Sequence, residues 1–450
     1  MIKKIQHLVL AVCAFAALFC GCLNTVPDYT EAEILHQNQE ALTEVIIHDV
    51  FSPPVASRIY AYASLAQYEA IRFERDSNPS MAARFHGFKA FPEPEPGKEY
   101  NYTLAATKAF FTVVRKVVFS VDSLQGHEDR VYGQFRKTLS RETFDRSVQF
   151  GEAVGKVVLA RASEDNYAQG RAKVKFLGEQ KPGRWRPTAP DYLDGVEWCW
   201  GTMKPLFLDP ADLNENLPVP PEYSLEEDSE YFTEVKDLHA MTANLTAEQE
   251  EIAKFWDDNP FVIEHAGHMM FGNKKITPNG HWMGIAAIAA RKTNADPVKT
   301  AKTFAATAAA MYDAFICCWN LKYKYSTVRP ISVINEHMDE SWQPLLQTPP
   351  FPEYPSGHST ITRAAAEVLT AMYGEGFAFE DTSDLKYIGM KRSFRSFRHA
   401  ADEASISRVY GGIHYRFSVD QGARDGKKVG EKMLQKLGME HGLNADHQTE

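Results

Sequence analysis

The spacing of hydrophobic residues predicts helices almost throughout the chain. Apolar residues recur every three or four positions over 45–75, 101–120, 128–137 and 143–165, which is the period of an amphipathic helix. The run 301–319 is rich in alanine and apolar on nearly all sides, which predicts a buried helix at the centre of the fold. No segment shows the alternation of a β-strand over any length. We therefore predict an all-α protein built as a helical bundle.

Local signals place some of the helix ends. Asp296 followed by Pro297 is a capping residue with proline at the first helical position, so the central helix is predicted to start there. Ser418 with Gln421 three positions later forms a capping box, which is predicted to open the last helix. Residues 168–235 are rich in proline, glycine and tryptophan, which predicts a long irregular segment across the surface.

The first group of candidate functional residues lies at the end of the central helix. Lys322 and Arg329 are seven residues apart, which is two helical turns, so both can project to one side of a helix. Pro330 disfavours helical backbone at the residue before it, so we expect the helix to end near Arg329. Each residue has an ordinary alternative, Lys322 as a solvated cation at a helix end and Arg329 as part of a helix stop.

The second group lies before another predicted helix. Ser356, Gly357 and His358 precede an apolar run, 361–373, that Gly374 closes. They are therefore expected at a helix N-terminus, where free N–H groups and the positive end of the helix dipole attract anions. The glycine also allows an anion to approach the backbone closely. The ordinary alternative is a simple helix cap.

The third group contains Arg408 and His414, which lie six residues apart across Gly411 and Gly412. The two glycines are expected to break the helix and let the histidine turn back toward the arginine. Together the three groups supply three cations, a hydroxyl, a glycine amide and two histidines. This set suits a tetrahedral or trigonal-bipyramidal oxyanion, held by charges and flanked by imidazoles.

The three groups resemble the K-x6-RP, PSGH and SR-x5-H motifs of the type 2 phosphatidic acid phosphatase and vanadium-dependent haloperoxidase superfamily, over about residues 245–437. The resemblance implies a helical bundle of the acid phosphatase/vanadium haloperoxidase type. It implies that the phosphate or vanadate oxygens are bound by Lys322, Arg329, Ser356, Gly357 and Arg408. His414 would be the nucleophile that forms a phosphohistidine, or the axial ligand of vanadate. His358 would protonate the leaving oxygen, or act as acid–base toward peroxide.

One position departs from the family pattern. The third motif usually carries Asp four residues after its last histidine, and this chain has Ser418 there. Serine and aspartate are comparable helix caps, so the structural role survives the change. Any role of that aspartate in orienting His414 is put in doubt.

The resemblance also suggests residues around the oxyanion site. Trp319 and Phe351 match aromatic residues that flank vanadate in chloroperoxidase-type relatives, although both could be simple core residues. Asp257 or Asp258 could support the arginine or histidine of the pocket, with a surface acid at a helix end as the alternative. Asp313 lies on the buried central helix and needs a partner, for which a pocket cation is a candidate.

Three further histidines are candidate metal ligands, namely His265, His268 and His281. Two histidines three residues apart can bind a metal, but no nearby set of partners completes a zinc site. We therefore predict no direct cation site.

Three functions follow from these residues. The first is a phosphatase that hydrolyses small phosphomonoesters through a phosphohistidine and needs no cofactor, because every required residue is present. The alternative is a haloperoxidase that holds vanadate in the same cage and oxidises halide with peroxide. The second alternative is a surface binding protein that has kept the fold without the chemistry, and Ser418 is the one feature in its favour.

The ends and charge of the chain bear on its location. Lys3 and Lys4 precede an apolar run, 8–19, and a segment ending in Cys22 that resembles a bacterial lipobox. We predict a lipoprotein signal peptide over 1–21, a lipidated Cys22 and a place in the cell envelope, with the outer membrane favoured; plain secretion and an N-terminal membrane helix are the alternatives. The net charge of −10 argues against nucleic acid as a partner.

We predict that the chain has two further divisions after the signal peptide. These are an N-terminal helical layer, 22–245, and a catalytic core, 246–440.

Overall fold

The computed structural model describes residues 29–439, apart from 76–77, 216, 261–262, 267–268 and 273–274, and the side chains of 263–266 and 269–272 lie outside that description. The predicted signal peptide, Cys22 and His268 fall outside the described residues, as does the side chain of His265. The expectations for them remain predictions.

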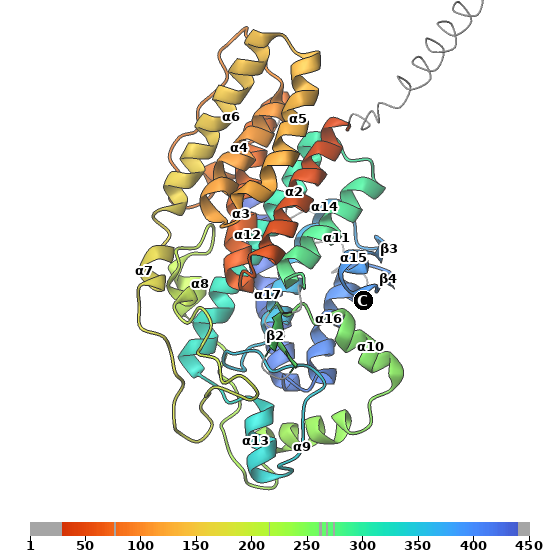
Figure 1. Ribbon diagram of the computed structural model, residues 1–450. Helices are drawn as coiled ribbons and strands as arrows, with labels where there is room; N and C mark the ends of the chain where they lie inside the picture. The colour runs from red at the N-terminus through yellow and green to blue at the C-terminus, as the bar shows by residue number, and fades with distance from the viewer. Residues whose placement is uncertain are drawn as a thin grey trace, which may run out of the picture.

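The described chain is mostly helical, which confirms the predicted fold class (Figure 1). The α-helices are α2 (Glu31–His48), α3 (Pro53–Ile71), α4 (Tyr102–Val117), α5 (Gln125–Thr138), α6 (Arg141–Ala162), α7 (Tyr167–Arg171), α8 (Pro210–Asn214), α9 (Glu230–Thr242), α10 (Ala247–Phe255), α11 (Pro278–Lys292), α12 (Pro297–Tyr325), α13 (Pro330–His337), α14 (Gly357–Tyr373), α15 (Leu385–Ile388), α16 (Phe397–Tyr410) and α17 (Arg416–Leu437). Short 3₁₀ helices are η1 (Arg72–Glu74), η2 (Ala82–Arg84), η3 (Val121–Leu124) and η4 (Trp200–Thr202).

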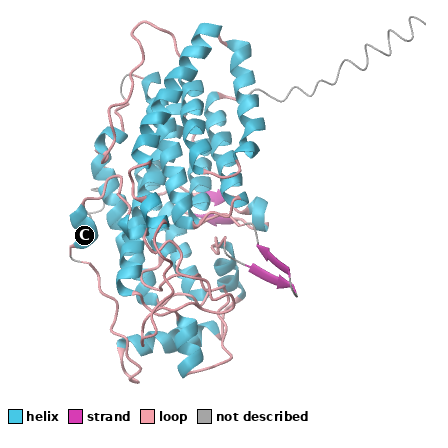
Figure 2. Cartoon of the chain, turned by 60° about the vertical axis from the view of Figure 1, so that its left-hand side comes forward, coloured by secondary structure: helices cyan, strands magenta, loops and turns pink. Residues whose placement is uncertain are grey.

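Four short strands depart from the expectation that the chain has none. They form two antiparallel pairs, β1 (Ile263–Ala266) with β2 (Met269–Gly272) and β3 (Phe379–Asp381) with β4 (Arg392–Phe394). Strands of three or four residues are too short to produce a recognisable alternation in the sequence. Figure 2 shows how small a part of the described chain they make up.

The predicted buried helix is α12, which packs against α3 on one side and α14 on another. Its alanine-rich surface lets neighbouring helices approach closely. It is also long and apolar enough to cross a membrane, but 94% of the apolar window is buried inside the protein, as in the core helix of a folded domain. Because α3 and α12 share one continuous hydrophobic core, the predicted N-terminal layer packs directly on the catalytic part. The division at residue 245 remains a prediction.

Two predicted helix boundaries were wrong. The helix that carries Lys322 ends at Tyr325, and Arg329 is the N-cap of α13 rather than the exit of α12. Pro330 occupies the first position of α13, where its missing N–H costs nothing, so it starts a helix rather than only ending one. The last helix starts at Arg416, so Ser418 lies inside α17 and does not cap it.

Close packing of α17 on α14 positions the second group of candidate residues. Gly422 and Gly430 lie on the face of α17 that meets α14. A Cβ at Gly422 would lie 2.6 Å from the carbonyl oxygen of Ser356, and one at Gly430 would lie 2.6 Å from Cβ of Glu367. Glycine at these positions therefore lets the N-terminus of α14 lie directly against α17.

The predicted irregular segment, 168–235, contains short helices and the start of α9. It contacts the end of α12, where Trp319 and Asn320 donate hydrogen bonds to the carbonyl oxygens of Val196 and Leu213. It also supplies the partner of Asp313, which was expected to be a pocket cation. The Asp313 carboxylate instead accepts hydrogen bonds from the backbone N–H groups of Leu206, Phe207 and Leu208, at 2.7, 2.8 and 3.0 Å. The prediction was wrong because no pattern in the sequence indicates that this segment returns to α12.

Candidate active site

The three groups of residues come together around one cavity between α12, α14 and α16. Lys322 lies in the last turn of α12, Arg329 at the start of α13, and His358 in the first turn of α14. Arg408 lies near the end of α16, and His414 lies in the turn between α16 and α17. The residues that line the cavity include Trp319, Phe351, Gly357, His358, Arg408 and His414.

Lys322 and Arg329 are fully buried, and backbone carbonyl groups hold them in place. Nζ of Lys322 donates to the carbonyl oxygens of Pro352 and Glu353 at 2.8 and 2.9 Å. Nε of Arg329 donates to the carbonyl oxygen of Phe351 at 2.8 Å. Carbonyl oxygens orient these two side chains without pairing them with a carboxylate, so both can interact with an anion.

Arg408 is held in a similar way on the other side of the cavity. One terminal nitrogen donates to the carbonyl oxygen of Trp256 at 2.5 Å, and Nε donates to Oγ of Ser407 at 3.0 Å. The side chain is 1% exposed and makes no ion pair with a carboxylate among the described residues. Arg408 lines the cavity together with His414, and Lys322 and Arg329 lie against the Phe351 ring that forms part of its wall.

The N-terminus of α14 has the form that the sequence predicted. Ser356 is the N-cap, and its hydroxyl accepts a hydrogen bond from the N–H of Ser359. A Cβ at Gly357 would lie 3.4 Å from the Trp319 ring and 3.9 Å from Cε of Lys322. Glycine therefore keeps open a space between the helix N-terminus and the lysine, where an oxyanion can meet both.

His414 is buried between the cations and an acid. Nε2 lies 3.3 Å from a terminal nitrogen of Arg329, and Nδ1 lies 2.8 Å from Oε1 of Glu353. Burial, followed by the charges of Arg329 and Lys322, lowers the pKa of His414 well below its ordinary value. The imidazole is therefore neutral, as a nucleophile or a ligand must be.

His358 faces the same cavity with a free nitrogen. Its Nε2 has no hydrogen-bond partner within the described part of the chain, and it lies 3.8 Å from Oδ2 of Asp258. Burial and the charge of Arg408 lower its pKa well below the ordinary value. A neutral imidazole with an unused nitrogen can take a proton from a bound reactant or return one to it.

The predicted wall and supporting residues are also found at the cavity. Trp319 and Phe351 both line it, with ring centroids 5.0 Å apart. Of the two candidate acids, Asp258 approaches His358, whereas the carboxylate of Asp257 pairs with Lys275. Asp258 has a backbone φ of +41°, which is uncommon for this residue type and is often found at functional sites.

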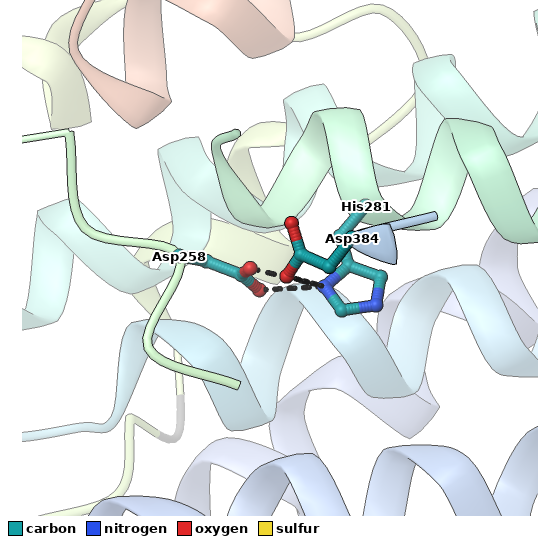
Figure 3. Close-up of side chains that lie close together, drawn as sticks. All are labelled: Asp258, His281 and Asp384. Atoms are coloured by element: carbon teal, nitrogen blue, oxygen red, sulfur yellow. Dashed lines mark hydrogen bonds and ion pairs between the residues drawn. The ribbon is translucent and has the colours of Figure 1, made fainter. Parts of the chain in front are cut away.

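Behind Asp258 lies a buried cluster that the sequence did not reveal. Nδ1 of His281 lies 3.0 and 3.1 Å from the two carboxylate oxygens of Asp258 and 3.6 Å from Oδ2 of Asp384 (Figure 3). Nε2 lies 2.9 Å from Oδ2 of Asp381. Burial opposes a charge on His281, but Asp258 and Asp381 outweigh it and raise its pKa well above the ordinary value. His281 is therefore a buried imidazolium held between carboxylates.

The same residues have the composition of a metal site. Asp258, His281 and Asp384 each offer one ligand atom, and these atoms lie within 4.8 Å of one another. With a protonated imidazole the hydrogen-bonded arrangement is an ion-pair cluster, and a metal would have to displace the imidazole proton to bind there. Sequence reasoning missed it because Asp381 and Asp384 reach His281 from about a hundred positions away, through tertiary packing alone.

Glu353 is the second residue that sequence reasoning missed. It is fully buried, contacts His414, and its backbone carbonyl binds Lys322. The one available signal was its position, an acid three residues before Ser356 in a segment crowded with prolines.

Comparison with known proteins identifies the family. The VCPO second helical-bundle domain model matches residues 302–440. A bacterial vanadium-dependent iodoperoxidase of known structure is 43% identical, with a TM-score of 0.84 over 91% of this chain and 97% of its own. Holo and apo structures of a bacterial vanadium-dependent chloroperoxidase are 16% identical, each with a TM-score of 0.65 over 87% of this chain and 93% or 95% of their own, and show a shared fold. No functionally curated sequence matches the chain.

The 43% identical iodoperoxidase relative favours the haloperoxidase alternative over the phosphatase that the sequence analysis preferred. The cage alone could not separate the two, because both chemistries use the same cations and histidines. With the three motifs assembled around one cavity and a 43% identical relative over nine-tenths of its length, the chain is an enzyme of the type 2 phosphatidic acid phosphatase and vanadium-dependent haloperoxidase superfamily.

Proposed function

We propose that the protein is a vanadium-dependent haloperoxidase that oxidises iodide with hydrogen peroxide. The observation that supports it most is the 43% identity, over nearly the whole of both chains, to a protein described as a bacterial vanadium-dependent iodoperoxidase. The buried cage is consistent with it, since it offers three cations and a neutral imidazole to one oxyanion.

The residues present fit vanadate. One terminal nitrogen of Arg329 is buried without a hydrogen-bond partner among the described residues, as expected of a donor reserved for an anion. Lys322, Arg408 and the N-terminus of α14 would hold further oxygens, and Nε2 of His414 would bind the vanadium. Bound vanadate would supply a Lewis acid that activates peroxide for oxygen transfer to the halide.

The protein itself supplies orientation and proton transfer. The carbonyls of 351–353 hold Lys322 and Arg329 toward the space in front of His414. His358 is neutral and has a free Nε2 on the cavity, so it can accept a proton from peroxide as peroxide binds. Trp319 and Phe351 give the cavity an apolar wall, which limits water and suits a large, weakly hydrated halide.

The test uses protein starting after residue 22, treated with a chelator and then assayed with and without orthovanadate. Peroxide-dependent conversion of iodide to triiodide should require vanadate and should be lost in H414A. H337A is the matched control, because His337 is a partly exposed histidine on α13 that does not line the cavity. Failure of the vanadate-loaded protein to oxidise iodide, or full activity in H414A, would contradict the proposal.

We also propose that lipidated Cys22 anchors the enzyme in the cell envelope, on the strength of the lipobox-like N-terminal sequence. Mass spectrometry of the mature protein should find a diacylglycerol-modified N-terminal cysteine, and C22A should leave the membrane fraction. An unmodified N-terminus at another residue would contradict it.

A further inference from the structure

The hydrogen-bond partners of His414 show which of its two ring nitrogens carries the proton and which carries the free lone pair. Its Nε2 lies 3.3 Å from a guanidinium nitrogen of Arg329, and a guanidinium can only donate hydrogen bonds. Nε2 must therefore be the acceptor nitrogen, and in a neutral ring the proton must then be on Nδ1. That proton points at Oε1 of Glu353, 2.8 Å away.

The carboxylate of Glu353 is placed to accept a hydrogen bond from this N–H group. Its side chain is fully buried, and Oε1 also accepts from the backbone N–H of Tyr415 at 3.2 Å, which fixes the carboxylate relative to the turn that carries His414. Its backbone N–H donates to the carbonyl oxygen of Thr327 at 3.0 Å. Glu353 thus ties His414 to the segment that follows α12.

The same residue couples His414 to the lysine of the cage. The backbone carbonyl of Glu353 accepts from Nζ of Lys322 at 2.9 Å, while its carboxylate faces His414. A rotation of the 351–353 segment would therefore disturb both the His414 imidazole and the Lys322 side chain.

Ser418 lies beside the same imidazole, at the position where the family pattern has an aspartate. Oγ of Ser418 lies 3.4 Å from Nδ1 of His414, at the outer limit of a hydrogen bond. An aspartate at this position could reach Nδ1, whereas the serine hydroxyl contributes little. In this chain the carboxylate comes from the loop before α14 instead of from α17.

We propose that Glu353 is the positioning residue of His414, holding it as the Nδ1–H tautomer so that Nε2 is free and electron-rich for the oxyanion centre. Glu353 takes the place of the aspartate that Ser418 replaces. The proposal deepens the proposed haloperoxidase function and rests on it for the identity of the bound oxyanion. Carboxylates that orient a ligating histidine commonly change affinity for the bound centre by roughly 10- to 100-fold.

The experiment measures orthovanadate binding to the chelator-treated protein by calorimetry, which needs no halide or peroxide. E353Q is expected to raise the dissociation constant by roughly 10- to 100-fold, while S418A, the matched control beside the same imidazole, should stay within about twofold. The double variant E353Q/S418D returns a carboxylate from α17 and should recover most of the affinity. Wild-type affinity in E353Q, or equal losses in E353Q and S418A, would overturn the proposal.

A second measurement covers the case in which E353Q does not fold. In protein with ¹⁵N-labelled histidine, the His414 signals, assigned by their loss in H414Q, report the tautomer directly. The Nδ1–H form supports the proposal, and the Nε2–H form overturns it. If the wild-type protein binds vanadate and shows this tautomer yet oxidises no halide, the proposed function fails while the role of Glu353 stands.

Discussion

Anion binding at this site should be accompanied by proton uptake, and Lys322 should be the main group that accepts the proton. Burial lowers the pKa of Lys322 to about 7, and Arg329 adds to the effect. At pH 8 about 90% of a lysine with that pKa is neutral, whereas at pH 6 about 10% is neutral. A tetrahedral anion beside Nζ favours the charged form, so binding should pull a proton onto Lys322.

The size of the effect follows from the shift. Returning the pKa from about 7 to the ordinary lysine value is a change of about 3.5 units, or about 5 kcal/mol of coupling between proton and anion. Binding should therefore take up about 0.9 proton per anion at pH 8 and about 0.1 at pH 6. Because the charged lysine attracts the anion, affinity should fall as pH rises above 7, by up to about tenfold per unit.

Sulfate is the suitable probe, since it keeps the same charge across this range, and calorimetry in two buffers of different ionisation enthalpy counts the protons. Glu353 also titrates nearby, because burial raises its pKa to about 7. The difference between wild type and K322M therefore isolates the contribution of Lys322, which K322M should remove together with much of the affinity. Equal proton uptake in the two proteins at pH 8 would refute the reasoning.

Three further predictions concern the surroundings of the cage. H281N cannot bridge Asp258 and Asp381 and leaves buried carboxylates unpaired, so urea denaturation should show a loss of about 3–5 kcal/mol; an unchanged midpoint would contradict the ion-pair cluster. D313N replaces an oxygen acceptor with a donor facing backbone N–H groups, so the same assay should show a loss of roughly 2–3 kcal/mol, with orthovanadate affinity unaltered as the check that Asp313 lies outside the cage. H358A should lower kcat for iodide by roughly 100- to 10,000-fold with less than about tenfold change in orthovanadate affinity; a loss confined to affinity would assign His358 to binding instead.

Most features encoded by residues close in sequence were predicted correctly, although the local signals at Pro330 and Ser418 placed two helix ends wrongly. The amphipathic period gives the helices, and the Ser356 cap before an apolar run places α14 and its anion-binding end correctly. Helix α16 ends at Tyr410, directly before the two glycines, as predicted. His414 turns back toward Arg408, and these two residues line one cavity. Each of these signals acts within one or two helical turns, where the backbone alone decides the outcome.

Features that depend on tertiary packing were missed. Glu353 reaches His414 across 61 positions, and Asp381 reaches His281 across 100. Asp313 finds three amides in an irregular segment that carries no periodic pattern. The sequence does not distinguish a buried acidic residue from an exposed one. The partner of a buried acid can therefore be identified only from the folded structure, where the acid and its partner lie close together.

The central claim is that vanadate activates this cage rather than inhibiting it. A single orthovanadate titration of chelator-treated protein tests it, following iodide oxidation by peroxide and p-nitrophenyl phosphate hydrolysis in parallel samples. The haloperoxidase account predicts that iodide oxidation rises with vanadate and saturates at one equivalent per chain, while any hydrolysis falls over the same range. Hydrolysis that vanadate suppresses, with no iodide oxidation at any concentration, would contradict it and restore the phosphatase interpretation.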